Sequence, residues 1–498
     1  MTAAEPLRMG TAAGRWAVTA TVAGSAVAMV AGTVVNVALP DIADGLDTGT
    51  LGVQWILNSY MLALASLILI GGALGDTFGR RRIYVLGTVV FGVASVAAAA
   101  APTIGTLLAA RVLMGIGGAL LTPGSLAILE ASFAEEDRSA AIGAWSGFGG
   151  IAAAVGPLVG GLLLDVGGWR SLFLLNVPVC ALAVVLTVRH LPESKDPSAD
   201  GSRLDWLGTI TAAVGLGALT YGLIGLGDGV TGLSVGAASL GAVVLVGFVV
   251  VERRVPAPLV PLGMFTDRTF SVANGITFVV YAALGGVFFL LVVFLREVLG
   301  FSGVQAGAAT LPITSLMLLL SARSGRLASR IGPRIPLTIG PLLLAAGMVG
   351  YSLLGEGSTY LRDVLPAMLV FGAGLVLLVA PVTATVLAAA DSAKAGVASG
   401  INNAVARTAG LLAVAVLPPA AGLGPGAFDN PARFAAGFSR AMLLTAALAF
   451  ASAIIAFLGL PSTLRTPRRG PDPGPHERTH CTLDAPPSVG TRPVESSR

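Results

Sequence analysis

An all-α integral membrane protein is predicted by the composition, by repeated apolar runs and by the placement of the basic residues. Of 498 residues, 55% are hydrophobic and only 11% are charged, whereas soluble domains carry roughly 25% charged residues. A chain this apolar cannot be solvated as a globule, so its helices must span a lipid bilayer. The formal charge of +4 does not indicate nucleic-acid binding, because the arginines separate apolar runs rather than forming a basic stripe.

Apolar runs of about 20 residues, the length that crosses a bilayer as a helix, follow one another along most of the sequence. We predict fourteen spans, at residues 16–39, 51–74, 83–101, 104–129, 140–164, 171–190, 206–227, 232–251, 270–295, 305–322, 335–354, 364–389, 396–421 and 437–460. An even number of spans places both ends of the chain on the same side of the membrane.

The basic residues indicate which side that is. About 23 of them fall in the linkers of one side and about 5 in those of the other, and an excess of Lys and Arg marks the cytoplasm. Both ends, segments 1–15 and 461–498, are then cytoplasmic. The second segment is rich in Pro, Arg, Ser and Thr, so we expect it to be disordered.

A duplication is indicated by a tight Gly-rich basic turn, Gly72–Arg82, which recurs in weaker form as Gly325–Arg334. Two copies about half a chain apart imply two similar bundles of six helices, at 16–190 and 270–460. The remaining segments are polar or Pro-rich linkers at 191–205 and 252–269 and an inserted pair of helices between them, 206–251.

The pattern Gly-x-Leu-x-Asp-x-x-Gly-Arg-Arg in the first turn resembles the signature loop of the major facilitator superfamily. The resemblance implies a latch that holds one of two conformations, a gate built from Gly72, Asp76, Gly79, Arg80 and Arg81. Thr77 stands where the family has a basic residue, which weakens the latch. Ser329 replaces the acid in the second copy, so only the first copy can be a charged switch. The alternative is a plain turn whose arginines only satisfy the charge bias.

Arg111 lies inside the fourth predicted span, where a charge is costly and usually functional. The run Arg111–Gly118 resembles the family's Arg-x-x-Gln-Gly-x-Gly motif, with Met114 in place of Gln. We expect Arg111 to be a proton relay or a structural charge that pairs with Asn36 or with carbonyl groups of the first helix. The alternative is an arginine whose side chain extends to the headgroups.

The fifth span contains Gly156, Pro157 and Gly160. Glycines four residues apart permit close helix packing, and Pro157 removes a backbone donor and bends the helix. The run resembles the Gly-Pro motif of the superfamily's antiporters, the exporters in particular. Ordinary glycine-mediated packing is the alternative.

Four stretches resemble the 14-helix drug:proton antiporter branch of this family: Thr33–Pro40, Gln54–Tyr60, Trp169–Pro178 and Gly400–Asn403. The resemblance implies the major facilitator fold, with two six-helix bundles and two inserted helices. It also implies secondary active transport, a proton-coupled efflux of drugs, antibiotics or amphipathic metabolites.

One position departs from this branch, because Ala31 stands where the first helix commonly carries an acid. The residue that couples transport to protons therefore cannot be assigned from the resemblance. Asp76, Glu130 and Asp41 remain as titratable candidates near a membrane face. Asp41, with Asp44 and Asp47, also fits a solvated loop.

A second intramembrane arginine, Arg407, lies near the middle of the thirteenth span. Gly396, Gly400, Asn403, Arg407 and Gly410 share one helical face. A pathway with Arg111 and Arg407 but no central carboxylate favours neutral or anionic amphipathic substrates over lipophilic cations. The alternative for Arg407 is a structural pairing with helix carbonyl groups.

Polar and aromatic side chains suited to a drug-sized cavity are Asn36, Trp55, Tyr60, Asn274, Tyr281 and Asn403. Packing or lipid contact is the alternative for each aromatic residue. We expect no metal site from His476, His480 and Cys481, no cofactor, and no ATP-driven step, since no nucleotide-binding loop occurs.

We therefore expect a monomer of the bacterial inner membrane whose partners are lipid, protons and a small substrate, and not an enzyme. The alternatives are a metabolite or osmolyte carrier of the same fold without proton antiport and, more remotely, a membrane-embedded enzyme.

Overall fold

The computed structural model describes residues 7–195, 204–390, 395–424, 427 and 430–462, and within these ranges the regular elements are helices. In chain order they are α1 (Ala12–Thr33), η1 (Val34–Ala38), α2 (Leu39–Gly45), α3 (Thr50–Phe78), α4 (Arg80–Ala99), α5 (Ile104–Ser132), α6 (Glu135–Leu174), α7 (Asn176–His190), α8 (Trp206–Asp228), α9 (Gly232–Glu252), η3 (Leu262–Thr266), α10 (Arg268–Glu297), α11 (Gly303–Ala309), α12 (Leu311–Ile331), α13 (Arg334–Ser352), η4 (Tyr360–Val364), α14 (Leu365–Ala388), α15 (Ala395–Ala420) and α16 (Pro431–Gly459). The tail 463–498, which we expected to be disordered, lies outside the described residues.

The all-helical membrane fold is confirmed, with a difference in the number of spans. In the described part of the chain, thirteen segments are long and apolar enough to cross a membrane. One of them, Val155–His190, combines parts of the predicted spans 140–164 and 171–190. Gly168 has non-helical backbone angles (φ 69°, ψ 177°) and interrupts α6 there. The preceding part of α6 is already long enough for one crossing at about 1.5 Å per residue, so this segment contains the break between two predicted spans.

The basic turn is shorter than the sequence predicted. Helix α3 continues through Asp76 to Phe78, and α4 begins at Arg80. Only Gly79 leaves the helical conformation, with a φ of 111° that favours glycine. The glycines at 72 and 75 are tolerated within α3, so they do not end the helix.

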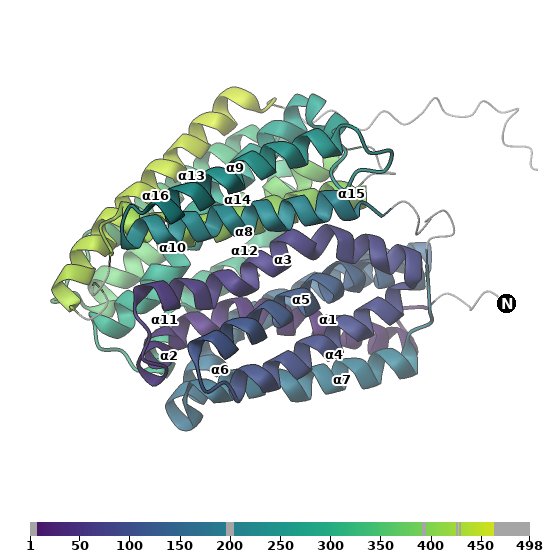
Figure 1. The fold of residues 1–498 in the computed structure, drawn as a ribbon. Helices are drawn as coiled ribbons and strands as arrows, with labels where there is room; N and C mark the ends of the chain where they lie inside the picture. The colour runs from purple at the N-terminus through teal and green to yellow at the C-terminus, as the bar shows by residue number, and fades with distance from the viewer. Residues whose placement is uncertain (1–6, 196–203, 391–394, 425–426, 428–429, 463–498) are drawn as a thin grey trace, which may run out of the picture. The chain divides into compact units, whose positions relative to one another are not determined.

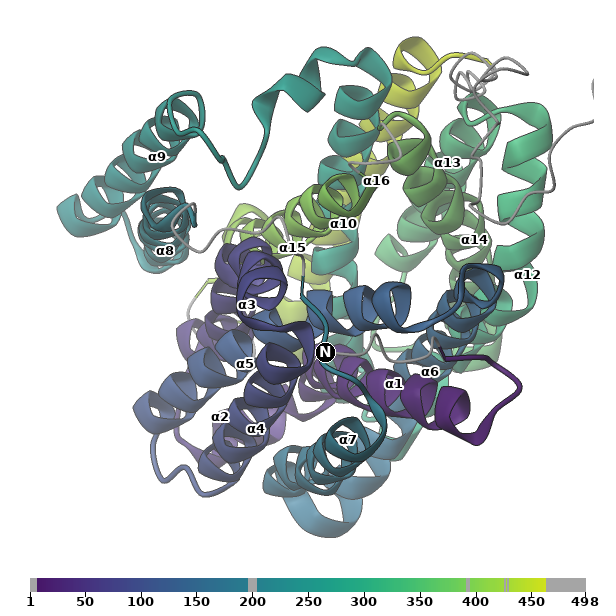
Figure 2. The same cartoon turned by 90° about the vertical axis from the view of Figure 1, so that its right-hand side faces the viewer.

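The helices form two groups that follow the order of the sequence (Figures 1 and 2). Helices α1 and α3–α7 pack against one another, and so do α10 and α12–α16. Helices α8 and α9 pack together beside these groups, and α8 also contacts α3 and α15. The inserted pair therefore touches one helix of each group.

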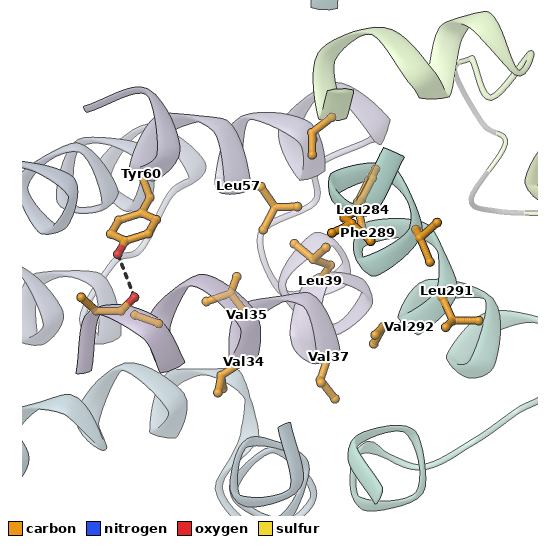
Figure 3. Packing of buried hydrophobic residues seen from close by; sticks show 14 of the residues in the cluster. Val34, Val35, Val37, Leu39, Leu57, Tyr60, Leu284, Phe289, Leu291 and Val292 are labelled. Carbon is orange, nitrogen blue, oxygen red and sulfur yellow. Dashed lines mark hydrogen bonds between the residues drawn. The ribbon is translucent and has the colours of Figure 1, made fainter. Parts of the chain in front are cut away.

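The two groups meet in a packed apolar region where η1 and α2 contact α10 (Figure 3). Leu39 lies beside Leu284 and Phe289, and Val35 belongs to the same cluster. All four side chains are at most 5% exposed. We call the end of the helices that carries Gly79 the basic face and the end that carries α2 the opposite face. The apolar contact joins the groups toward the opposite face.

Candidate functional site

The basic turn is held by an ion pair within its own helical group. The Arg80 Nε donates to Asp76 Oδ1 at 2.8 Å, one helical turn away. A guanidinium nitrogen of Arg80 also donates to the carbonyl oxygen of Ala127 in α5, at 3.4 Å. In this conformation, and among the described residues, Asp76 therefore pairs with its own turn rather than with the other group.

The segment after α7 binds the same turn, a contact that the sequence analysis did not predict. The backbone N–H of Arg80 donates to the Ser194 carbonyl at 2.8 Å, and that of Arg81 donates to Glu193 Oε1 at 3.0 Å. A methyl group on Gly79 would lie 2.7 Å from the same carboxylate oxygen. The sequence analysis therefore missed Glu193 as a contact of the basic turn, since its only signal was an acid in a linker opposite three arginines.

Arg111 is fully buried, so the proposed extension of its side chain to the headgroups is excluded. Its Nε donates to the Ile56 carbonyl at 3.0 Å, and Nη1 donates to the Ala31 carbonyl at 3.4 Å. The expected pairing with a first-helix carbonyl is therefore confirmed, whereas the Asn36 amide donates to Phe288 instead, at 3.5 Å.

Tyr60 completes the surroundings of this arginine. The guanidinium carbon of Arg111 lies 4.5 Å from the centre of the Tyr60 ring, and the Tyr60 hydroxyl donates to the Ala28 carbonyl at 2.9 Å (Figure 3). Arg111 thus ties α5 to α1 and α3 through carbonyl groups and an aromatic face. No carboxylate in the described part of the chain pairs with it.

The Gly-Pro run of α6 packs on two sides. Gly160 approaches Val34, because an added methyl would lie 2.5 Å from Val34 Cγ1. On the other side, the Pro157 carbonyl oxygen occupies the space that a side chain at Gly307 would need. Because Gly307 belongs to α11, the short helix between α10 and α12, this run brings the backbone of α6 against the connection between two helices of the other group.

Polar contacts join the two groups at the opposite face. Asp41 of α2, which the sequence suggested was solvated, accepts from Arg296 Nη2 of α10 at 2.6 Å. Asp165 of α6 accepts from the backbone N–H groups of Gly303 and Val304 at 2.8 and 3.0 Å. We use the name outer latch for this set of residues: Asp41, Arg296, Asp165, Gly303 and Val304. Gln54 also donates to the Val414 carbonyl, at 3.1 Å, which adds a contact between α3 and α15.

Arg407 lies midway along α15 and is half-buried. It is near enough to Tyr60 and Tyr281 to interact with both electrostatically. No ion pair links Arg407 to an acid among the residues that the structure describes. Tyr60 thus contacts Arg111 and is also near Arg407, which has no acidic partner among the described residues.

The other residues expected to line a cavity lie in different surroundings. The Trp55 ring lies 6.1 Å from that of Tyr221 in α8. Asn274 is 3% exposed and donates to the Phe270 carbonyl of its own helix at 2.9 Å. Asn403 is exposed. Within the described ranges no group of three or more His, Cys, Asp or Glu could hold a metal ion, and the tail residues once considered for one lie outside these ranges.

The chain is similar in sequence to known membrane proteins. A sequence model described as the Major Facilitator Superfamily matches residues 21–415. The multidrug resistance protein Stp of Mycobacterium tuberculosis is 35% identical over 77% of this chain and 71% of its own length. The puromycin resistance protein pur8 of Streptomyces alboniger is 36% identical over 81% and 80%, and the tetracenomycin C resistance and export protein of Streptomyces glaucescens is 35% identical over 77% and 72%.

Solved structures share the fold at low sequence identity. A bacterial homologue of the human lysosomal transporter Spinster, in an inward-facing and unoccupied conformation, has a TM-score of 0.65 at 17% identity and covers 90% of this chain and 97% of its own. A D-xylose–proton symporter has a TM-score of 0.64 at 16% identity, covering 90% and 98%. These similarities concern the fold alone.

Proposed function

Because this chain belongs to the Major Facilitator Superfamily, we propose that it exports small amphipathic molecules of the drug or antibiotic class across the plasma membrane in exchange for protons. Three of its relatives are named as resistance or export proteins. The chain is a multi-pass membrane protein. We place it in a bacterial inner membrane as a monomer, with the basic face and both ends in the cytoplasm.

The outer latch is the observation that carries export. The Asp41–Arg296 ion pair and the hydrogen bond from Gly303 of α11 to Asp165 join the two groups at the opposite face. Among the described residues, Asp76 pairs within its own turn. With the basic face in the cytoplasm, this is a conformation closed to the outside, which would load substrate from within the cell. We assign the two rocking bundles to 16–190 and 270–460 and the inserted pair to 206–251.

The charge of the interior favours neutral or anionic substrates. Arg407 has no acidic partner among the described residues, and Arg111 is compensated only by carbonyl groups and the Tyr60 ring. A lipophilic cation would meet two positive charges, whereas an acidic or hydrogen-bonding group on the substrate would neutralise Arg407. Tyr281 would support such a group from α10.

Proton coupling must use another group than the missing first-helix acid. Ala31 occupies that position, and its carbonyl accepts from Arg111. Arg111 therefore acts as a structural charge that holds three helices together. The same absence favours the second candidate function, a metabolite carrier of this fold that does not exchange protons.

Everted membrane vesicles that hold a preformed pH gradient separate the two functions. Tetracenomycin C, the compound named for one relative, should dissipate the gradient, whereas the permanent cation ethidium should do so weakly. Arg407→Gln should lower the response to tetracenomycin C at least several-fold. Arg323→Gln, which removes an exposed arginine of α12, is the matched control. Transport without any change in the gradient would favour the uncoupled carrier.

A further inference from the structure

Two buried carboxyl groups meet where α8 begins and α9 ends. Asp205 caps α8, and its Oδ1 accepts from the Gly208 N–H at 2.6 Å. Glu252 is the last residue of α9, and its Oε2 accepts from the Val260 N–H at 2.9 Å. Their exposed fractions are 6% and 3%. Among the described residues, only these two and Arg111 are charged side chains buried to this degree.

The second oxygen of each carboxyl group lacks a donor among the described residues. Asp205 Oδ2 and Glu252 Oε1 are buried, and no hydrogen-bond donor in the described part of the chain reaches them. Both oxygens border the space next to Gly208, since a methyl group there would clash with each. The two carboxyl groups therefore lie next to each other beside Gly208 and interact electrostatically.

Two adjacent carboxylates cannot both stay ionised in a buried site, because their repulsion adds to the cost of removing each from water. A single proton removes one charge and supplies the missing donor for the other oxygen. Arg253 and Arg254, the next residues in the chain, are exposed, and among the described residues Asp205 is the charged side chain that acts on Glu252 electrostatically. Among the described residues, no basic side chain forms an ion pair with Asp205 or Glu252.

We propose that Asp205 and Glu252 form a proton-binding site in which one proton is shared between the two carboxyl groups. We call it the acid clasp. It fastens the first turn of α8 to the end of α9 and, through Val260, to the segment that leads to α10. The proposal does not depend on what the protein transports.

The acid clasp is placed to affect the contact between the two helical groups. Helix α8 packs against α3 and α15. Gly227, near its far end, lies against Pro419 of α15 toward the opposite face, so the acid clasp lies at the basic face. Losing the shared proton would create a second buried charge, open the acid clasp and loosen α8 from the helices it joins. Protonation at the basic face would thus set how firmly α8 holds them.

Infrared spectroscopy of the full chain in lipid vesicles tests the shared proton directly. The wild type should show the C=O stretch of a buried protonated carboxyl group, which disappears as the pH is raised. Glu252→Gln and Asp205→Asn should each remove this band, because an amide then donates to the remaining carboxylate. Asp267→Asn is the matched control. Asp267 also caps a helix, because it accepts from the Phe270 N–H at 2.9 Å, but no second acid pairs with it among the described residues. An unchanged band in Glu252→Gln, or its loss in Asp267→Asn, would overturn the proposal.

Hydrogen exchange at the Val260 amide tests the mechanical consequence. Relative to Glu252→Gln measured at the same pH, the wild type should lose protection at Val260 as the pH rises. The Asp267→Asn variant should behave as the wild type does. If wild type and Glu252→Gln keep the same protection across the whole pH range, the carboxyl groups do not form a proton-dependent clasp.

Discussion

Removing the charge of Asp41 should open the face sealed by the outer latch. Its carboxylate accepts from Arg296 at 2.6 Å. The side chain of Arg296 is 14% exposed and that of Asp41 is 36% exposed. A partly buried, hydrogen-bonded ion pair contributes about 1–2 kcal/mol, more than a fully exposed pair. Asp41→Asn should therefore shift the balance between closed and open states by about 5–30-fold.

Arg296 also attracts Asp165 electrostatically, so the outer latch is one network rather than two independent contacts. Asp165 is itself exposed, and its two backbone donors contribute roughly 1 kcal/mol after allowance for solvent. Because the two acids share Arg296, the effect of Asp41→Asn with Asp165→Asn should differ from the sum of the single effects.

Cysteine labelling measures the opening. Val35 is 2% exposed in the apolar contact of Figure 3, and Val35→Cys changes its volume little. In a chain whose Cys180 and Cys481 are replaced by serine, a membrane-impermeant maleimide added outside should label position 35 about 5–30-fold faster when Asp41→Asn is present.

Asp44→Asn provides the matched control. Asp44 lies on the same short helix and is exposed, and its side chain forms no ion pair within the described residues. Equal labelling rates in Asp41→Asn and Asp44→Asn would show that the Asp41–Arg296 pair does not hold this face closed.

Three further substitutions probe the gate, the packing and the interior charge. In Gly79→Ala the alanine must adopt a φ near 111° and crowd Glu193, so the substitution should lower stability by about 1–2 kcal/mol. The melting temperature in detergent measures this effect. Gly49→Ala is the control, because an added methyl there meets open space. Gly307→Val would collide with the Pro157 carbonyl and should raise outside labelling as Asp41→Asn does, without changing any charge. Ala31→Asp would place a carboxylate beside Arg111 and should increase ethidium export relative to tetracenomycin C, measured in everted vesicles; an unchanged ratio would contradict our assignment of substrate charge.

The membrane fold could be predicted from the sequence because it depends on local hydropathy. Apolar length alone marks most spans, and a glycine-rich turn followed by three arginines marks the basic face. Predicted boundaries were wrong where local signals mislead. Glycines at 72 and 75 suggested a loop, although α3 continues to Phe78. The break in α6 at Gly168, by contrast, lies between the predicted spans 140–164 and 171–190.

The site was less predictable because its contacts join distant parts of the chain. Asp41 looked like a solvated loop residue, since nothing local identifies Arg296, 255 residues later, as its partner. Glu252 looked like the first residue of a polar linker, because an acid that follows an apolar run is usually solvated. Its burial depends on how α8 and α9 pack, which periodicity does not specify. Arg111 was predictable as a feature, because a charge inside an apolar span is costly wherever the helix packs.

The strength of the outer latch can be compared with the driving force for transport. The ion pair and the backbone donors together contribute about 2–3 kcal/mol. One proton crossing a membrane potential of 100 mV provides about 2.3 kcal/mol, and each unit of pH difference adds about 1.4 kcal/mol. A latch of this size can be opened by a single proton and still hold the outer face closed in its absence. A much stronger latch would stall the cycle, and a much weaker one would let substrate return. Replacing Asp165 alone removes the smaller contribution to the outer latch. It should therefore reduce the substrate gradient that vesicles reach more than it reduces the initial export rate. Equal losses in both would indicate a damaged pathway rather than a leaking gate.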